Sequence, residues 1–207
     1  MSSVLIPAFN LSKEPLDWHH MDAKLSDENL MKNYAAGDQH AFEELYTRHK
    51  GAVFRYFLRQ CSDQGTAEEL YQDVWVKLIN AKANYKPEAK FTTWLFTLAH
   101  NHLVDWYRKQ GRKLDKVSAN DEIPEVTAHE NWQPENDFER KRLGKALTEA
   151  VMKLTNEQSE VFLMHQEGGL TVKEIAEILN ISHEAAKSRY RYATKKLRQR
   201  LEAVKRL

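Results

Sequence analysis

The sequence predicts an all-α protein with two small helical domains joined by an acidic flexible linker, the second containing a helix-turn-helix. Apolar residues recur at steps of three and four through most of the chain, which is the spacing of helices with one buried face. No run of residues alternates as a strand would. Between about 114 and 137 the helical period disappears while acidic residues and prolines accumulate, which is typical of a linker.

These patterns divide the 207 residues into four segments. Residues 1–24 have no clear period and are interpreted as a flexible N-terminal extension. Residues 25–113 form the first domain, 114–137 the linker and 138–207 the second domain, and each domain is long enough to bury a core. The linker is either a simple spacer or, through its negative charge, an occupant of a channel built for nucleic acid.

Four helices are expected in the first domain. Ser26 and Asp38 are typical N-caps for the first two, and Gly37 ends the first. The T-x-x-E motif at 66–69 predicts a capping box that starts the third helix. The fourth helix begins with an aromatic and apolar stripe at Phe91 and ends in a basic tail.

In the second domain, two helices precede the helix-turn-helix. One starts near Phe138, and the next is capped by Thr155 and stops at Gly168 and Gly169. A capping box formed by Thr171 and Glu174 then starts a short helix, and Ser182 restarts the chain as an N-cap after a tight turn. The final helix extends to about residue 201 and carries many lysines and arginines.

The final helix has the pattern of a DNA recognition helix. Small and apolar residues recur on one stripe and are expected to be buried, whereas the basic residues face outward and attract phosphates. Near its start, a helix inserted in a groove would present Glu184, Lys187, Ser188 and Arg191 to base edges. A basic C-terminal helix is often only a solvated face, but the capped partner helix and the tight turn favour DNA binding.

Composition excludes several classes of protein. The formal net charge is +1, so the basic C-terminus is offset by acids elsewhere. The single Cys61 cannot form an internal disulfide, and no apolar run approaches the roughly 18 residues of a membrane span, so a cytoplasmic protein without membrane insertion is expected. Nucleotide-binding, metalloprotease and nucleophile-elbow motifs are not found. His100 and His102 lack a neighbouring Cys or acidic cluster, so we expect no metal and no cofactor.

Three segments, taken in order, resemble bacterial RNA polymerase sigma factors. The stretch TAEELYQDVW at 66–75 is similar to their polymerase-binding helix, and FTTWLFTLAHN at 91–101 with DWYR at 105–108 is similar to their helix that reads the −10 promoter element. The segment 170–197 resembles their −35-reading helix-turn-helix. Two compact helical domains and a linker match the extracytoplasmic-function (ECF) branch of the family.

The resemblance implies a role for each segment. An alternative sigma factor binds core RNA polymerase and promoter DNA, has no catalytic site of its own and is commonly controlled by an anti-sigma factor. The implied polymerase contacts are Glu68, Glu69, Asp73 and Trp75. The implied −10 contacts are Tyr85, Lys90, Phe91, Asn101, Arg108, Lys109, Arg112 and Lys113. The implied −35 contacts are Thr171, Lys173, Glu184, Lys187, Ser188, Arg191, Tyr192 and Lys195.

Other interpretations of these residues remain open. Acids at the start of a helix also arise from the helix dipole, and packing explains Trp94 and Leu98 better than stacking on bases does. The main alternative for the whole chain is a conventional dimeric helix-turn-helix transcriptional regulator, which would bind paired half-sites. A helical enzyme is a poorer alternative, because His and acidic residues are not clustered at a catalytic spacing.

Thr66 stands where many family members carry an acid, which makes it a candidate phosphorylation site. A phosphate there would add negative charge at the docking surface and change the affinity for polymerase. We expect Thr66→Glu and Thr66→Ala to differ from each other in affinity for core polymerase, measured by titration of labelled protein. Equal binding by both variants and the unmodified protein would end this hypothesis.

Overall fold

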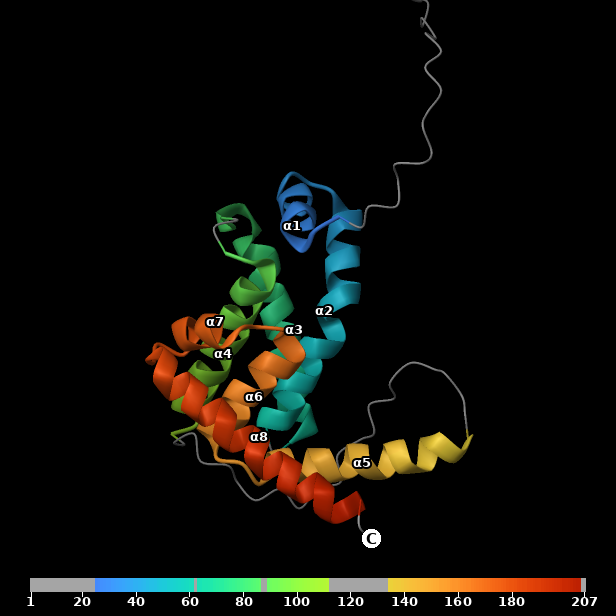
Figure 1. Ribbon diagram of the computed structural model, residues 1–207. Coiled ribbons are helices and arrows are strands. Elements are labelled where there is room, and N and C mark those ends of the chain that lie inside the picture. The colour runs from blue at the N-terminus through green and yellow to red at the C-terminus, as the bar shows by residue number, and fades with distance from the viewer. Residues whose placement is uncertain (1–24, 62, 87–88, 112–133, 206–207) are drawn as a thin grey trace, which may run out of the picture.

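The computed structural model describes residues 25–61, 63–86, 89–111 and 134–205, and every regular element in these ranges is a helix. The elements are α1 (Asp27–Ala35), α2 (Gln39–Gln60), α3 (Gln64–Ala81), a short 3-10 turn η2 (Lys82–Asn84), α4 (Phe91–Lys109), α5 (Pro134–Met152), α6 (Asn156–Gly168), α7 (Val172–Ile178) and α8 (His183–Lys205). The predicted all-α class is therefore confirmed, with two helical groups and a helix-turn-helix in the second (Figure 1). The predicted extension at 1–24 and most of the predicted linker lie outside the described residues.

The first helical group is α1 to α4, and the expected caps start its first two helices. The Ser26 hydroxyl accepts a hydrogen bond from the Asn29 N–H, and the Asp38 carboxylate accepts from the His40 and Ala41 N–H groups. Helix α2 packs between α1 and α3, and α3 packs against α4. The caps and the packing together fix the direction of α3 and α4, which carry the candidate interfaces.

The predicted capping box at 66–69 is wrong. Helix α3 begins at Gln64, and its N-cap is Asp63, whose carboxylate accepts from the Gly65 N–H at 3.3 Å and the Thr66 N–H at 2.6 Å. Hydrogen bonding by the Thr66 side chain, followed by the backbone N–H groups of Thr66 and Gly65, lowers the pKa of Asp63. Aspartate is as good a cap as threonine, so the chain starts the helix at the earlier of two possible positions.

Helix α4 is capped from a distant part of the chain. Its local N-cap position, Lys90, supplies no side-chain hydrogen bond, whereas the carboxylate of Glu28 on α1 accepts from the Phe91 N–H at 2.9 Å. This hydrogen bond is the main cause of a lowered pKa for Glu28. The preceding Asp27 binds Arg48 of α2 at 2.8 Å. Helix α1 therefore ties the start of α4 to α2.

The second helical group is α5 to α8, in which α8 packs against the other three helices. Helix α5 begins at Pro134, inside the predicted linker, because proline at the first helical position lacks only a donor that would be unpaired anyway. The predicted ends of α6 are confirmed: the Thr155 hydroxyl accepts from Gln158 N–H, and Gly169 adopts a left-handed φ of +61°. The capping box of α7 is also confirmed, with both reciprocal hydrogen bonds present.

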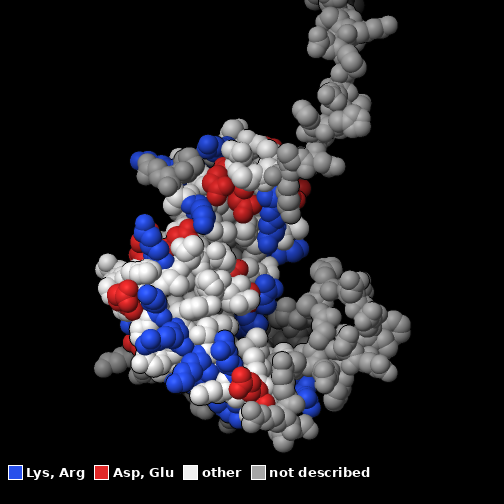
Figure 2. All heavy atoms as spheres, in the orientation of Figure 1, with Lys and Arg blue, Asp and Glu red and all other residues white. Residues whose placement is uncertain are grey.

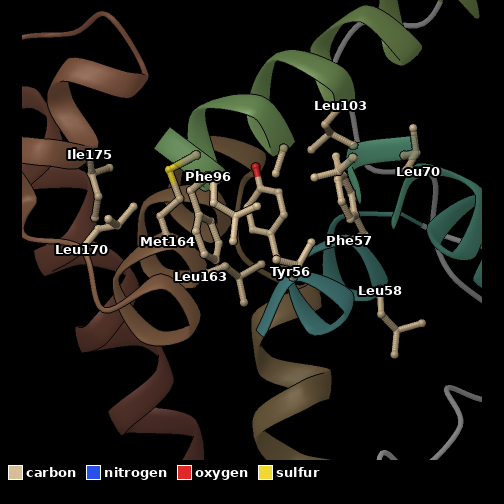
Figure 3. Packing of buried hydrophobic residues seen from close by; sticks show 14 of the residues in the cluster. Tyr56, Phe57, Leu58, Leu70, Phe96, Leu103, Leu163, Met164, Leu170 and Ile175 are labelled. Atoms are coloured by element: carbon tan, nitrogen blue, oxygen red, sulfur yellow. The ribbon is translucent and has the colours of Figure 1, made fainter. Parts of the chain in front are cut away.

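The two groups pack directly against each other. Helix α6 lies on α2 and α4, and α7 lies on α4 (Figure 1). Tyr56 of α2, Phe96 of α4 and Met164 of α6 are all fully buried, and they meet in one continuous apolar core (Figure 3). Gly168 permits this approach, because a Cβ at that position would lie 3.0 Å from the Phe96 ring. The helical spacing predicted these apolar faces, but not that they would join.

Polar contacts surround this shared core. Glu167 of α6, with a side chain only 6% exposed, accepts from Arg55 Nε at 2.7 Å and also pairs with Arg59, both from α2. His100 of α4 lies 2.7 Å from the Glu160 carboxylate of α6. In each pair the acid comes from the second group and the basic residue from the first.

A further contact connects the capping box of α7 to the first group. Glu174 accepts from the Thr171 N–H and hydroxyl, both at 2.7 Å, while its other carboxylate oxygen lies 3.1 Å from the Lys90 ammonium. Burial alone would raise the pKa of Glu174, but these hydrogen bonds from Thr171 and Lys90 outweigh it and hold the pKa at about 2.

The lowered pKa of Glu174 predicts a pH-dependent contribution to stability. Its carboxylate is ionised in the folded protein at pH values where the unfolded chain, with a pKa near 4.5, takes up a proton. Its stabilisation is therefore complete above about pH 4.5 and is lost as the pH falls toward 2. We expect Glu174→Gln to lower the free energy of unfolding at pH 6 and to have a much smaller effect at pH 2.5, measured by urea denaturation.

Glu177, an exposed glutamate on the same helix, is the matched control. Glu177→Gln is expected to change the free energy of unfolding by less than about 0.5 kcal/mol at both pH values. A Glu174→Gln effect of equal size at pH 6 and pH 2.5 would contradict the prediction.

Candidate nucleic-acid and protein interfaces

Helix α3 presents an acidic surface to solvent. Glu68, Glu69 and Asp73, all predicted polymerase contacts, are exposed on its outer side. Trp75, the fourth predicted contact, is 5% exposed, and its ring packs edge-on against Tyr46 with centroids 4.9 Å apart. The structure therefore places Trp75 in the core beneath this surface, and its assignment as a polymerase contact stays a prediction.

Two apolar residues that sequence analysis missed complete this surface. Val76 is 54% exposed and Ile79 is 38% exposed, one and two turns beyond Asp73 on α3. The buried residues Leu70, Val74 and Leu78 define the core stripe of the helix. Val76 and Ile79 lie off that stripe. Their departure from the helical spacing is the signal in the sequence from which their exposure could have been predicted. An acidic surface with an apolar border suits a partner helix that carries both basic and apolar residues.

His102 holds Asp73 in place from α4. Its Nε2 lies 3.1 Å from the Asp73 carboxylate and its Nδ1 lies 2.8 Å from the Lys77 ammonium. Because an ammonium group only donates, Nδ1 accepts and Nε2–H donates to Asp73. Burial, followed by the positive charge of Lys77, lowers the pKa of His102 and favours this neutral form. These three residues line a pocket of about 260 Å³ between α3 and α4.

Aromatic residues cluster where α4 begins. Tyr85 packs against Trp94 with ring centroids 5.1 Å apart, and Phe91 lies 6.1 Å from the Trp94 ring. Phe91 is fully buried, and its assignment as a base contact stays a prediction. Tyr85 and Trp94 are each half-buried, and Trp94 packs against the core as expected. Tyr85 is thus the more accessible of the two aromatic residues among the predicted −10 contacts.

The polar −10 candidates lie along α4. Asn101, Arg108 and Lys109 are exposed, and Arg108 pairs with Asp105 at 3.2 Å. Lys90 is 62% exposed and is engaged by Glu174 of the second group, as described above. Arg112 and Lys113 were also predicted to contact DNA but lie outside the described residues.

The first turns of α8 carry a continuous exposed stripe. Its members recur at steps of three and four and are Glu184, Lys187, Ser188, Arg191 and Lys195, with Tyr192 beside them. Ser188 is half-buried, the others are exposed, and Arg191 lies over the Tyr192 ring at 5.3 Å. Figure 2 shows that Lys and Arg side chains gather on the part of the surface formed by α8. This stripe has the length and charge to enter a major groove.

The two −35 candidates outside α8 differ in their availability. Lys173 is exposed on α7. The Thr171 hydroxyl donates to Glu174 and accepts from the Glu174 N–H, so the capping box already uses its hydrogen-bonding groups. Thr171 thus positions α7 and is not a free donor for DNA.

The described residues lack two features that other kinds of site would need. They contain no group of three or more His, Cys, Asp or Glu side chains arranged to hold a metal ion. None of the described helices is long and apolar enough to cross a membrane.

Known families match both helical groups. The model of sigma-70 region 2 matches residues 45–113, and that of sigma-70 region 4 matches residues 144–197. The chain is 30% identical over 183 residues to the ECF RNA polymerase sigma factor SigK of Mycobacterium bovis, which covers 84% of this chain and 92% of the relative. It is 29% identical over 143 residues to the RNA polymerase sigma factor YlaC of Bacillus subtilis, covering 69% of this chain and 81% of the relative.

Two solved structures share the fold. One is CnrH in complex with the cytosolic domain of CnrY, with a TM-score of 0.57, 24% identity and coverage of 86% of this chain and 97% of that one. The other is the sigma factor RpoE in complex with the anti-sigma factor NepR from Bartonella quintana, with a TM-score of 0.58, 22% identity and coverage of 78% and 96%. With region 2 over the α3 and α4 surfaces and region 4 over the helix-turn-helix, the chain belongs to the ECF RNA polymerase sigma factors.

Proposed function

We propose that this sigma factor docks on core RNA polymerase through the exposed face of α3 and directs promoter-specific initiation. The contact residues are Glu68, Glu69, Asp73, Val76 and Ile79. The observation that supports this proposal best is the mixed acidic and apolar character of an exposed α3 face. Val76 and Ile79 are exposed on the same helix as the three acids, so this face offers a partner both apolar and charged contacts.

Promoter recognition is divided between the two helical groups in this proposal. In α4, Tyr85 and Asn101 contact unstacked bases of the −10 element, while Lys90, Arg108 and Lys109 neutralise phosphates. In α8, the stripe from Glu184 to Lys195 reads the −35 element in the major groove, and Lys173 of α7 contacts the backbone. Arg112 and Lys113 remain predicted phosphate contacts.

The same proposal covers catalysis, location and regulation. Nucleotide addition belongs to the polymerase, and this chain contributes binding energy alone. Because promoter and polymerase are found in the cytoplasm, this chain acts there. The CnrH and RpoE structures contain partner proteins, which supports an anti-sigma factor as a regulator here as well. Such a partner would compete with polymerase for α3.

The proposed function predicts strict dependence on core polymerase. The purified protein alone should bind promoter DNA weakly, and addition of core polymerase should produce tight binding and transcription from defined start sites. Gel shifts with and without core polymerase measure the promoter binding, and mapping of transcripts made in vitro identifies the start sites. Lys187→Ala with Arg191→Ala should reduce both signals, because these residues lie on the α8 stripe.

The alternative of a conventional regulator gives a different result in the same experiment. A dimeric helix-turn-helix protein would bind an inverted repeat tightly without polymerase. Tight, polymerase-independent binding as a dimer would overturn the proposed function.

A substitution at Val76 tests separately whether the α3 face binds core polymerase. Val76→Asp places a charge among groups that would be buried in the docked complex, and we expect it to weaken core polymerase binding about 10-fold or more. Leu25→Asp is the matched control, because Leu25 is 49% exposed and lies outside this face. Titration of labelled protein with core measures both affinities, and equal affinities would remove Val76 from the interface.

A further inference from the structure

A buried histidine lies directly beneath the proposed docking surface. His102 of α4 is 9% exposed and shares the core side of its helix with apolar residues such as Ala99 and Leu103. A polar ring at such a position is destabilising unless its nitrogen atoms form hydrogen bonds. Both nitrogens of His102 have partners on α3, so the ring connects the core of α4 to charged groups at the surface of α3.

The two partners of His102 carry opposite charges. Asp73 and Lys77 are four residues apart on α3, a spacing at which an acid and a base can pair directly. The ring of His102 bridges them: its Nε2–H donates to the Asp73 carboxylate at 3.1 Å, and its Nδ1 accepts from the Lys77 ammonium at 2.8 Å. The neutral imidazole can form both hydrogen bonds at once because one nitrogen is a donor and the other an acceptor.

This bridge leaves Asp73 available to a partner. The Asp73 side chain is 53% exposed, although one of its oxygens accepts from His102. An ionised carboxylate has about four acceptor positions, so the remaining ones can accept hydrogen bonds from basic residues of core polymerase. The hydrogen bond from a buried ring also restricts the rotation of Asp73, which reduces the conformational entropy lost when a partner binds.

The neighbouring charges show what would follow if the ring were absent. Besides Asp73 and His102, four charged residues line the pocket between α3 and α4: Glu69, Lys77, Asp105 and Lys109. Of the two cations, Lys77 is on the same helix as Asp73 at a spacing that favours an ion pair. Without His102, the Lys77 ammonium would be free to pair with Asp73 and would compete with the polymerase for its carboxylate.

We infer that His102 is a positioning residue of the docking surface, which holds the Asp73 carboxylate in the orientation that core polymerase binds and keeps the Lys77 ammonium from pairing with it. This inference rests on the proposed function, because it concerns docking on core polymerase through α3. His102 acts through Asp73 and does not itself contact the polymerase.

Three variants separate this role from a purely structural one. His102→Leu fills the same core position and removes both hydrogen bonds, whereas His102→Gln retains an amide N–H for Asp73 and a carbonyl oxygen for Lys77. His49→Leu is the matched control, because the His49 side chain of α2 is similarly buried and pairs with Asp27 of α1 at 2.7 Å. Circular dichroism and urea denaturation of each variant verify that the helices remain folded.

Titration of the labelled full-length proteins with core polymerase measures the effect. We expect His102→Leu to weaken binding about 5-fold or more, because it removes a hydrogen bond to a charged contact residue. His102→Gln should recover most of this affinity, and His49→Leu should bind as the unmodified protein does. Equal losses in the two His102 variants, or an equal loss in the His49 control, would overturn the inference.

Double variants test whether His102 acts through its two partners. In an Asp73→Asn background, His102→Leu should have little further effect on the affinity, because the carboxylate that the ring positions is gone. In a His102→Leu background, Lys77→Met should raise the affinity more than it does in the otherwise unmodified protein, because it removes the competing ammonium. Additive effects of these substitutions would overturn the inference.

The protonation of the ring can be measured without polymerase. Nitrogen chemical shifts from NMR of the isotope-labelled protein should show a proton on Nε2 of His102 and none on Nδ1 near neutral pH. The lowered pKa of His102, caused first by burial and then by Lys77, favours this neutral form. A proton on Nδ1 under these conditions would be incompatible with acceptance from Lys77 and would overturn the inference.

The titration also distinguishes this inference from the proposed function. If the unmodified protein did not bind core polymerase, the proposed function and the role of His102 would both be refuted. If the unmodified protein and His102→Leu bound core polymerase equally tightly, the role of His102 alone would be refuted and docking through α3 would stand.

Discussion

The arrangement of the whole molecule depends on how the charge of Glu167 is compensated. A carboxylate that is only 6% exposed cannot rely on water, and removal of its partners would leave an uncompensated charge in an apolar contact. Arg55 and Arg59 are four residues apart on α2, so both guanidinium groups lie on one face of that helix and reach the same carboxylate. This geometry specifies a single orientation of α6 on α2, which apolar packing alone would specify less strictly.

Helix α4 connects every function proposed for the molecule, because its faces have different partners. Leu95, Ala99 and Leu103 form its core stripe. On the side of the second group, His100 pairs with Glu160, and the Thr93 hydroxyl donates to Glu174. His102 reaches Asp73 on the docking surface, and the exposed residues near Arg108 are available to DNA. A shift of α4 would therefore move residues at the contact with the second group, on the proposed polymerase surface and among the proposed −10 contacts together.

The parts of the fold that were predicted from the sequence are those that depend on neighbouring residues. Caps such as Ser26, Asp38 and Thr171 act within three residues of themselves, and the stripe on α8 repeats every turn, so short segments contain the full information. Even here two residues able to cap a helix lie three positions apart, and Asp63 replaces the predicted Thr66 at the start of α3.

The parts that were not predicted depend on residues far apart in the chain. Arg55 and Glu167 are 112 positions apart, and Glu28 caps α4 from 63 positions away. Helical spacing shows which face of a helix is apolar but not which other helix covers it. For the same reason the aromatic residues Trp75 and Phe91 looked suitable for binding, although the tertiary packing buries both of them.

The ion pair between Glu174 and Lys90 connects the contact between the two helical groups with the proposed DNA binding. Glu174 occupies the ammonium group of Lys90, which in the proposed function neutralises a promoter phosphate. A phosphate at Lys90 would compete with this carboxylate for the N–H donors of the ammonium group, so the proposed −10 contact is expected to weaken the ion pair. In the proposed function, binding of the −10 strand at Lys90 and the ion pair that joins the two groups therefore oppose each other by linkage.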